Sequence, residues 1–185
     1  MAYVYSPFRK NYKTDVVKAF VGCGFCNDPL FSDQVVISTD GVAVENPFYQ
    51  WVVCKYPRFD GHTMLVPKRH ITTFAEESSD EILARQHLLV YADRILRERY
   101  PGAGVEVFLQ NGEGSSSSIA HLHWHLVPAR PDDPLRSFEK MGQFLTMEEG
   151  KEKVVLFPQV LECSPTEFRA SLQSFVTATP YVFDR

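Results

Sequence analysis

Three of the chain's six histidines lie in the segment 121–128, which reads His-Leu-His-Trp-His-Leu-Val-Pro. Alternate residues of a β-strand face the same side. His121, His123 and His125 would therefore share one face, with Cβ atoms roughly 6.5–7 Å apart, while the apolar residues between them face a core. Such a row offers nucleophiles, proton donors and metal ligands. A strand face that is merely solvated would more often carry Thr, Lys or Glu, so we expect this strand to carry chemistry.

The loop before this strand, residues 111–118, consists of small and polar residues and ends in four serines. Backbone amides and hydroxyls of Ser116, Ser117 and Ser118 could form a nest for an anion such as phosphate. A flexible loop without a ligand is the alternative. The neighbouring histidines favour the phosphate site, because a neutral imidazole beside phosphorus can act as nucleophile and a protonated nitrogen as proton donor.

A second group of reactive side chains is Cys23-Gly-Phe-Cys26, a pair of cysteines flanked by glycines. This spacing is typical of a metal knuckle, and a redox dithiol is the alternative. The turn residues Asn27-Asp28-Pro29 follow where a redox motif would open a helix, which favours metal. Two more ligands would close a tetrahedral zinc site, and His70 and one histidine of the strand are available. A site with four protein ligands has no open position and would be structural.

The elements that must position these residues follow from hydrophobic periodicity and turn signals. Ser78 to Glu81 form a capping box that opens a helix to about Tyr100. A second capping box starts at Ser164, with proline at the first helical position, and opens a helix to about Val176. The predicted strands are 35–37 and 42–44 around the turn Asp40-Gly41, then 51–54, 62–67, 105–110, the histidine strand 121–128, and 153–158.

Composition narrows the functional classes. The 185 residues are 44% apolar and 13% aromatic, which suits one folded domain. A net charge of −4 argues against general nucleic-acid binding. No apolar run is long enough for a signal peptide at the start or for a membrane span. We therefore expect a cytoplasmic protein, whose cysteines are thiols or metal ligands before they are disulfides.

Three blocks of the sequence resemble the histidine triad superfamily. The segment 121–128 looks like its signature, and Gly61-His62-Thr-Met-Leu-Val-Pro-Lys-Arg-His70 is similar to its second block. Ser6-Pro7-Phe8-Arg9 followed by the cysteine pair resembles the N-terminus of its zinc-bearing bacterial members. The resemblance implies an α+β fold in which helices pack on an antiparallel sheet of about five strands, usually as a homodimer. Residues 1–130 would form the catalytic domain, with 131–185 an extension packed on it.

The family pattern also implies roles for individual residues. His123 would be the nucleophile, His125 would contact the α-phosphate or the bridging oxygen, and Ser118 would contact phosphate. Zinc would be held by the four residues Cys23, Cys26, His70 and His121. The main-chain carbonyl of His121 would accept a hydrogen bond from His123 and so fix its tautomer. Substrate contacts are expected from Ser116, Ser117, Asn111 and Cys54, and Lys68, Arg69 or Arg130 could add positive potential.

Two positions depart from the family pattern. Ser117 stands where many hydrolase branches carry glutamine, and a small residue there resembles branches that phosphorolyse dinucleoside polyphosphates or transfer nucleotidyl groups. Cys54 stands where an Asp or Asn that contacts ribose is expected; Asn46 or Asp60 could substitute.

These observations leave three functional hypotheses, of which an enzyme that cleaves a dinucleoside polyphosphate at the α-phosphorus through a nucleotidyl-histidine comes first. The alternatives are a nucleotidyltransferase acting on an organic acceptor and a zinc-stabilised nucleotide-binding module without turnover.

Overall fold

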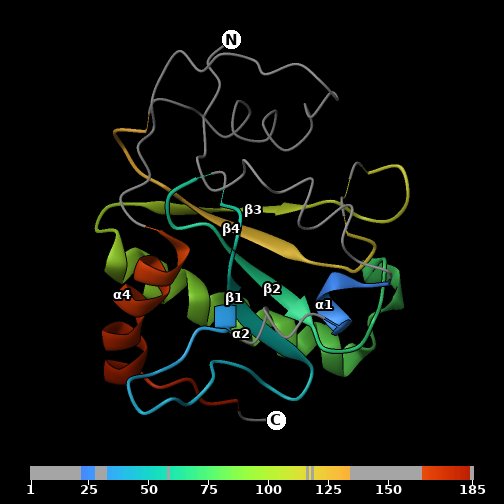
Figure 1. Ribbon diagram of the computed structural model, residues 1–185, viewed down its shortest axis with the longest axis horizontal. Helices are drawn as coiled ribbons and strands as arrows, with labels where there is room; N and C mark the ends of the chain where they lie inside the picture. The colour runs from blue at the N-terminus through green and yellow to red at the C-terminus, as the bar shows by residue number, and fades with distance from the viewer. Residues whose placement is uncertain are drawn as a thin grey trace.

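An antiparallel sheet forms the centre of the computed structural model, which describes residues 22–27, 33–57, 59–115, 117, 119–133 and 164–183. Within these residues the sheet has four strands in the order β1-β2-β4-β3 (Figure 1). The strands are β1 (Tyr49–Val53), β2 (Thr63–Pro67), β3 (Gly104–Leu109) and β4 (Trp124–Ala129). The predicted α+β class with an antiparallel sheet is confirmed.

The predicted count of about five strands is one too high for the described residues. The turn at Gly41 exists, with φ at +84°, but its two arms form only isolated bridges, Ile37 to Ala43 and Val35 to Val52. After Val44 the chain makes a tight turn, in which the side-chain oxygen of Asn46 accepts from the backbone N–H groups of Phe48 and Tyr49. Backbone hydrogen bonds still tie Val36 and Val44 to Trp51 at the edge of β1.

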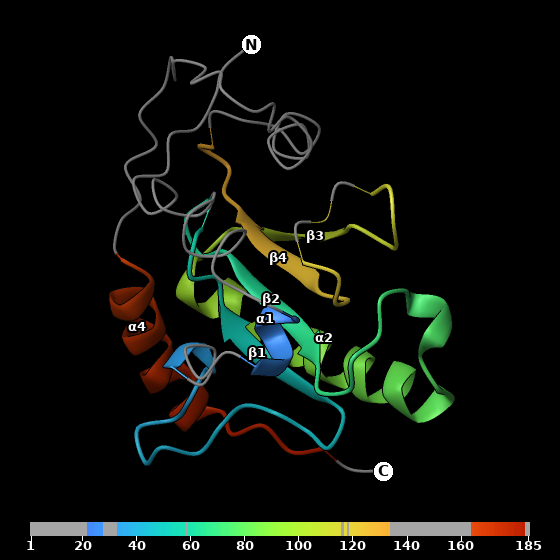
Figure 2. The same ribbon diagram turned by 45° about the vertical axis from the view of Figure 1, so that its right-hand side comes forward.

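Two helices cover one face of the sheet (Figures 1 and 2). Helix α2 (Ser79–Arg99) begins at the predicted capping box, in which Ser78 and Glu81 exchange hydrogen bonds between side chain and backbone. Helix α4 (Pro165–Ala178) begins with the same arrangement at Ser164 and Glu167 and ends two residues beyond the expected position. Both boxes therefore act as the sequence predicted. The core under these helices contains Trp51, Leu65, Leu126, Leu88, Ile95, Phe168 and Leu172.

The opposite face carries the one-turn helix α1 (Gly24–Asn27) and a smaller apolar cluster. Phe25 of α1 packs there with Val52, Met64 and Val66 of the central strands. Figure 2 shows α1 in front of β1 and β2, on the side away from α2. The cysteine pair is thereby held close to His121 and His123, whose rings both contact the ring of Phe25.

The predicted extension at residues 131–185 is described in part. Phe168, Leu172 and Val176 of α4 are buried in the same core as α2, as an extension packed on the domain requires. The expected strand 153–158 and the N-terminal block at residues 6–9 lie outside the described residues, and the boundary at residue 130 stays a prediction. Among the described helices, none combines the length and the apolar character that a membrane span needs.

Candidate functional site

The histidine segment is a strand only in its second half. Strand β4 begins at Trp124, whereas the sequence predicted a strand from His121. The register pairs Leu65 of β2 with Trp124, and no β2–β4 pair precedes it. Before Trp124 the chain leaves β2, and the backbone N–H of Leu122 donates to the carbonyl of Ile71 instead. The three histidines nevertheless share one side of the sheet, and all are buried, with exposed fractions of 3–6%. A solvated strand face is excluded.

At one end of the histidine row the four predicted metal ligands meet. The ligand atoms of Cys23, Cys26, His70 and His121 all lie within 4.8 Å of one another. Nδ1 of His121 is 3.2 Å from the sulfur of Cys23 and 3.5 Å from that of Cys26, whose sulfur is 3.3 Å from Nδ1 of His70. Zinc bonds of about 2.3 Å to sulfur and about 2.0 Å to nitrogen place the corners of a tetrahedron about 3.3–3.8 Å apart. The spacing therefore suits a tetrahedral metal site.

Protonation also suits a cation at this place. Nε2 of His121 lies 2.9 Å from the carbonyl of Pro67, which can only accept, so that nitrogen carries the proton and Nδ1 presents its lone pair to the sulfurs. Burial lowers the pKa of His121 to about 4 and keeps the ring neutral. Partial desolvation, followed by the hydrogen bond and charge of the neighbouring Cys23, raises the pKa of Cys26 to about 11. A bound dication would stabilise the thiolate that these surroundings otherwise disfavour.

His121 connects the metal group to the next histidine. Its main-chain carbonyl lies 2.7 Å from Nδ1 of His123, so Nδ1–H donates and Nε2 of His123 keeps its lone pair. Burial lowers the pKa of His123, while the hydrogen bond to the His121 carbonyl opposes this shift. The ring of Phe25 lies 5.2 Å from that of His123 and 5.5 Å from that of His121, between the two. His123 is thus held as a neutral imidazole with one free nitrogen, which is the nucleophilic form.

At the other end His125 meets a histidine for which the sequence suggested no role. Nε2 of His62 is 2.9 Å from Nδ1 of His125, and both residues are buried. The rings of His123 and His125 are 4.7 Å apart. The missed signal was strand pairing: Met64 lies opposite His125, and His62 is two residues before Met64, just before the start of β2. The sequence position of His62 suggests no role until the pairing of β2 with β4 is known.

The loop before the triad is anchored by side chains predicted to bind substrate. Asn111 accepts from the backbone N–H of Phe74 at 2.9 Å, and the Ser117 hydroxyl donates to the carbonyl of Ile119. Gln110 reaches the carbonyl of Ser115, which closes the loop. Asn111 and Ser117 therefore shape the loop, and their contacts to substrate stay predictions. Ser116 and Ser118 lie outside the described residues.

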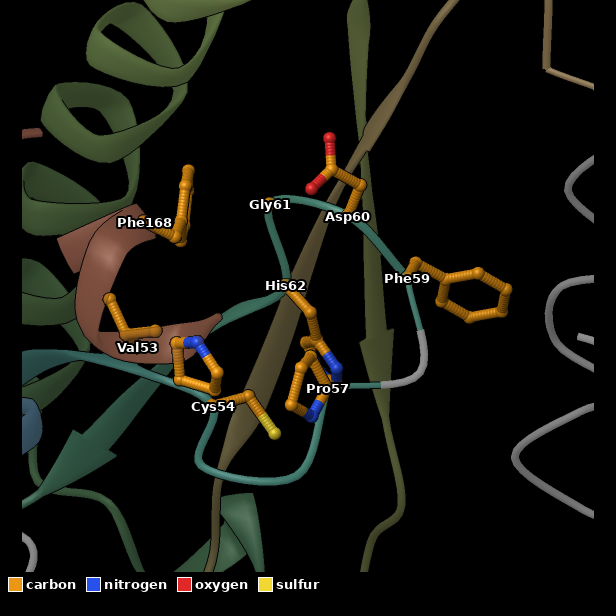
Figure 3. Close-up of a pocket in the computed structure, with 9 residues that line it drawn as sticks. Val53, Cys54, Pro57, Phe59, Asp60, Gly61, His62 and Phe168 are labelled. Carbon is orange, nitrogen blue, oxygen red and sulfur yellow. The ribbon is translucent and has the colours of Figure 1, made fainter. Parts of the chain in front are cut away.

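Cys54 is buried at the end of β1 and lines a small pocket with a cavity volume of about 10 Å³ (Figure 3). His62 lines the same pocket, and Pro165 and Phe168 of α4 close one side of it. Figure 3 shows the His62 ring turned toward Cys54 and Pro57, and the Asp60 carboxylate turned away from it. The pocket is below the usual range for a complete ligand, which is about 300–1,000 Å³.

Two possible substitutes for a ribose contact are already engaged elsewhere. Asn46 uses its whole amide, since its nitrogen donates to the carbonyl of Ala84 and to the hydroxyl of Tyr181 while its oxygen accepts two backbone N–H groups. Asp60 accepts from Tyr100 and pairs with Arg130. Both carboxamide and carboxylate therefore stabilise the fold.

The three basic residues considered for phosphate attraction are each paired with a carboxylate. Lys68 lies 3.1 Å from Glu45, Arg69 lies 2.8 Å from Glu81, and Arg130 lies 3.3 Å from Asp60. Their charges are therefore largely neutralised by the protein itself.

Comparison with known proteins agrees with this geometry. The model of the HIT domain matches residues 37–132, more than half of the chain. An uncharacterised HIT-like protein from Saccharolobus solfataricus is 28% identical over 117 residues, covering 60% of this chain and 77% of that protein. The protein named Hit from Bacillus subtilis is 36% identical over 70 residues, which are 37% of this chain and only about half of that protein, 47%. A bis(5′-adenosyl)-triphosphatase from Dictyostelium discoideum is 26% identical over 117 residues, with coverages of 61% and 72%.

Two solved structures have the same fold. Diadenosine triphosphate hydrolase from Plasmodium falciparum superposes with a TM-score of 0.54 at 16% identity, covering 80% of this chain and 78% of that one. A zinc-bound histidine triad protein from Mycobacterium smegmatis gives a TM-score of 0.53 at 17% identity, with coverages of 72% and 81%. At these identities the two solved structures show only that the fold is shared, whereas the match to the HIT domain model shows the family. The chain belongs to the HIT domain family, as its histidine row and the order of its sequence blocks predicted.

Proposed function

We propose that this protein cleaves a phosphoanhydride at the α-phosphorus of a nucleotide through a nucleotidyl-His123 intermediate, with a dinucleoside polyphosphate such as diadenosine tetraphosphate as the substrate. The observation that carries the proposal is the hydrogen bond between Nδ1 of His123 and the carbonyl of His121, because it leaves Nε2 as a buried, neutral nucleophile. Membership of the HIT domain family and a triphosphatase among the relatives support the substrate class.

The reaction divides into two displacements. Nε2 of His123 attacks the α-phosphorus, the bond from phosphorus to the bridging oxygen breaks, and the departing oxygen takes a proton from His125. Water or inorganic phosphate then attacks the same phosphorus and releases His123. The attacking water or phosphate gives up a proton, which returns to His125. Ser118 and the amides of the loop would stabilise charge on the phosphoryl oxygens, as preorganised donors do at other phosphoryl centres.

The four-ligand group would hold zinc in a structural role. All four positions are filled by Cys23, Cys26, His70 and His121, so zinc there would stabilise the fold rather than polarise the substrate. Through the backbone of His121 it would also hold the loop that orients His123. We expect close to one zinc per chain by elemental analysis after purification in metal-free buffer.

Product analysis with diadenosine tetraphosphate tests the proposal, with and without inorganic phosphate and with His123→Ala as control. Phosphate-dependent ADP plus ATP, absent from the variant, would identify a phosphorylase, which the small residue at Ser117 favours. AMP plus ATP without phosphate would identify a hydrolase. Turnover only with an added organic acceptor would identify a nucleotidyltransferase. Equal rates from wild type and His123→Ala would contradict the proposed nucleophile.

We further propose a cytoplasmic homodimer. Within the described residues β3 pairs only with β4, and Val107 on that edge strand is 42% exposed. An open strand edge with apolar side chains is a common place for a second copy to add its own strand. Light scattering coupled to size exclusion should give twice the mass of the 185-residue chain, and Val107→Lys should shift it toward the monomer.

A further inference from the structure

Trp124 lies between the two proposed catalytic histidines in the sequence, but its side chain belongs to the other face of the sheet. Alternate residues of a strand face opposite sides, and the indole packs against the core cluster under α2. Trp124 is also the first residue of β4, where it lies opposite Leu65 of β2 and Leu109 of β3. The indole therefore stands behind the histidine row, at the point where the row leaves the sheet.

The guanidinium of Arg85, in the second turn of α2, covers this indole. Its Cζ lies 4.3 Å from the centre of the Trp124 ring. That distance is well within the roughly 6 Å of a cation–π contact, and such a contact is stronger where the cation is shielded from water. The Arg85 side chain is only 13% exposed. Nε1 of the indole is buried and has no hydrogen-bond partner among the described residues, so within them the guanidinium is the polar group that orients the ring.

A buried carboxylate holds the guanidinium in place. Nε of Arg85 donates to Oε1 of Glu77 at 2.8 Å, and the Tyr49 hydroxyl donates to the same oxygen at 2.6 Å. Burial, followed by the bond to Glu77, raises the pKa of Tyr49, so its hydroxyl stays protonated and remains a donor. The Glu77 side chain is only 1% exposed, and bonds to a buried carboxylate are strong because water does not compete for them. Arg85 therefore has one well-defined position over the indole.

We call the four residues Tyr49, Glu77, Arg85 and Trp124 the clamp. Its first member, Tyr49, lies opposite Pro67 where β1 pairs with β2, and the carbonyl of Pro67 lies 2.9 Å from Nε2 of His121. Its last member, Trp124, is the residue after His123. The clamp therefore ends beside the anchors on both sides of His123, and the buried pair of Arg85 and Glu77 joins these two ends.

We propose that Arg85 is a positioning residue whose guanidinium, stacked on the indole of Trp124, fixes the backbone from which His123 attacks phosphorus. This inference rests on the proposed function and adds to it a residue from the opposite face of the sheet. The pairing of β4 with β2 and with β3 begins at Trp124, so neither strand pairing includes His123 itself. A nucleophile needs a narrow range of positions, and a displacement of about 1 Å can cost about 10²-fold in rate. A fixed Trp124 supplies that restraint from behind.

A double-mutant cycle on the rate of diadenosine tetraphosphate cleavage tests the contact itself. One change is Arg85→Met together with Glu77→Gln, which removes both charges at once because a buried carboxylate without its partner could unfold the chain. The other change is Trp124→Leu, which removes the aromatic face. Trp124→Phe keeps such a face under the guanidinium and serves as the conservative variant. Arg94→Met changes an exposed arginine of the same helix and serves as the control.

We expect each change to lower kcat by about 10-fold to 10²-fold and to alter KM by less than about 2-fold, because the position of the nucleophile is lost while the substrate site is kept. The two changes together should cost little more than either alone, since both break the same contact. Trp124→Phe should keep most of the rate, and Arg94→Met all of it. Losses that multiply in the combined variant, or a Trp124→Phe variant as slow as Trp124→Leu, would overturn the positioning role.

Amide hydrogen exchange separates positioning from a general loss of stability and needs no turnover. The backbone N–H of Leu122 donates to the carbonyl of Ile71 at 2.7 Å and so reports whether the histidine segment is held. In the Arg85→Met/Glu77→Gln variant we expect its exchange to rise by about 10-fold or more, while that of Leu172 in α4 stays unchanged. An equal rise at both amides, or no rise at Leu122, would overturn the inference. If the wild type did not cleave the nucleotide, the proposed function would fail, and the exchange at Leu122 would still decide whether the clamp holds the segment.

Discussion

The two ends of the histidine row use the same side chain for different chemistry. At the metal end His121 presents a lone pair to two thiols, and Cys26 and His70 are exposed. At the proposed catalytic end His123, His125 and His62 are buried; Nδ1 of His123 lies 2.7 Å from the carbonyl of His121, and Nδ1 of His125 lies 2.9 Å from Nε2 of His62. Sulfur neighbours and partial exposure suit a metal that must enter and bind, whereas burial would keep the proposed nucleophile His123 neutral.

The difference lies in the partners rather than in the histidines themselves. His121 and His123 are two residues apart, and both are buried, yet one faces Cys23 through Nδ1 and the other faces a carbonyl through Nδ1. The single backbone carbonyl of His121 joins the two ends. Substitutions at the proposed catalytic end should therefore mainly lower activity, and substitutions at the metal end should mainly lower stability.

The largest effect is expected at the catalytic end. His123→Ala should lower nucleotide cleavage by about 10³-fold or more, because no other group replaces the nucleophile, while zinc content stays unchanged. Steady-state rates together with elemental analysis would check this. His87→Ala, which removes an exposed imidazole from α2, should leave both quantities unaltered. Loss of zinc from the His123→Ala variant would contradict the view that the two ends of the histidine row act separately.

At the metal end we expect loss of stability first. Cys26→Ser should abolish zinc binding and lower the melting temperature by roughly 10 °C or more, since structural zinc contributes several kcal/mol of folding free energy. The matched substitution Cys54→Ser changes a thiol outside the group and should keep the zinc. Calorimetry with and without a chelator would measure the effect. A Cys26 variant with normal zinc and normal melting temperature would refute the assigned ligands.

A smaller effect is expected at the turn that leads into the catalytic end. Gly61→Ala should destabilise the protein by about 2–4 kcal/mol, because the added Cβ clashes with Pro128 and Tyr100 and the φ of +72° is strained for alanine. Gly104→Ala, where nothing lies within 4 Å of the added carbon, should change stability by less than about 0.5 kcal/mol. Denaturant unfolding of both variants would measure the difference. Similar values for the two would contradict the close packing of β2 on β4.

The smallest effect concerns Glu81, which binds Arg69, the neighbour in sequence of the candidate metal ligand His70. The hydrogen bond from Arg69 lowers the pKa of Glu81 to about 2 from its ordinary 4.5. The ionised carboxylate therefore stabilises the fold fully above pH 4.5, and this contribution is lost as the pH falls toward 2. Glu81→Gln should lower the melting temperature by only about 1–3 °C at pH 7, because solvent screens the exposed Arg69. The decrease should be smaller at pH 3, where part of the carboxylate's contribution is already lost. A constant difference at both pH values would exclude the ion pair as its cause.

Local patterns in the sequence predicted much of this architecture. The capping boxes at Ser78 and Ser164 place both long helices, since each depends only on residues three positions apart. The cysteine spacing predicted a metal site, and the resemblance to the histidine triad superfamily implied the four candidate ligands that the structure brings together. The histidine strand was predicted three residues too long at its start, because the departure of Leu122 toward Ile71 depends on a loop distant in the sequence.

What the sequence could not supply is pairing between distant segments. His62 and His125 are 63 residues apart, and only the register of β2 on β4 joins them. The engagement of Asn46 with Tyr181 and of Arg130 with Asp60 is likewise a property of the folded chain. Residues that looked available for substrate are therefore engaged within the protein, and His62, for which the sequence predicted no role, lies beside His125.

The central claim is that His123 becomes covalently attached to the nucleotide. Wild-type protein would be mixed with diadenosine tetraphosphate for milliseconds, quenched in alkali because bonds between histidine nitrogen and phosphorus hydrolyse in acid, and examined by mass spectrometry. We predict an adenylyl adduct on the peptide that carries His123, formed and lost at the rate of turnover, and absent from His123→Ala. Turnover without any adduct, or an adduct on another histidine, would contradict the account.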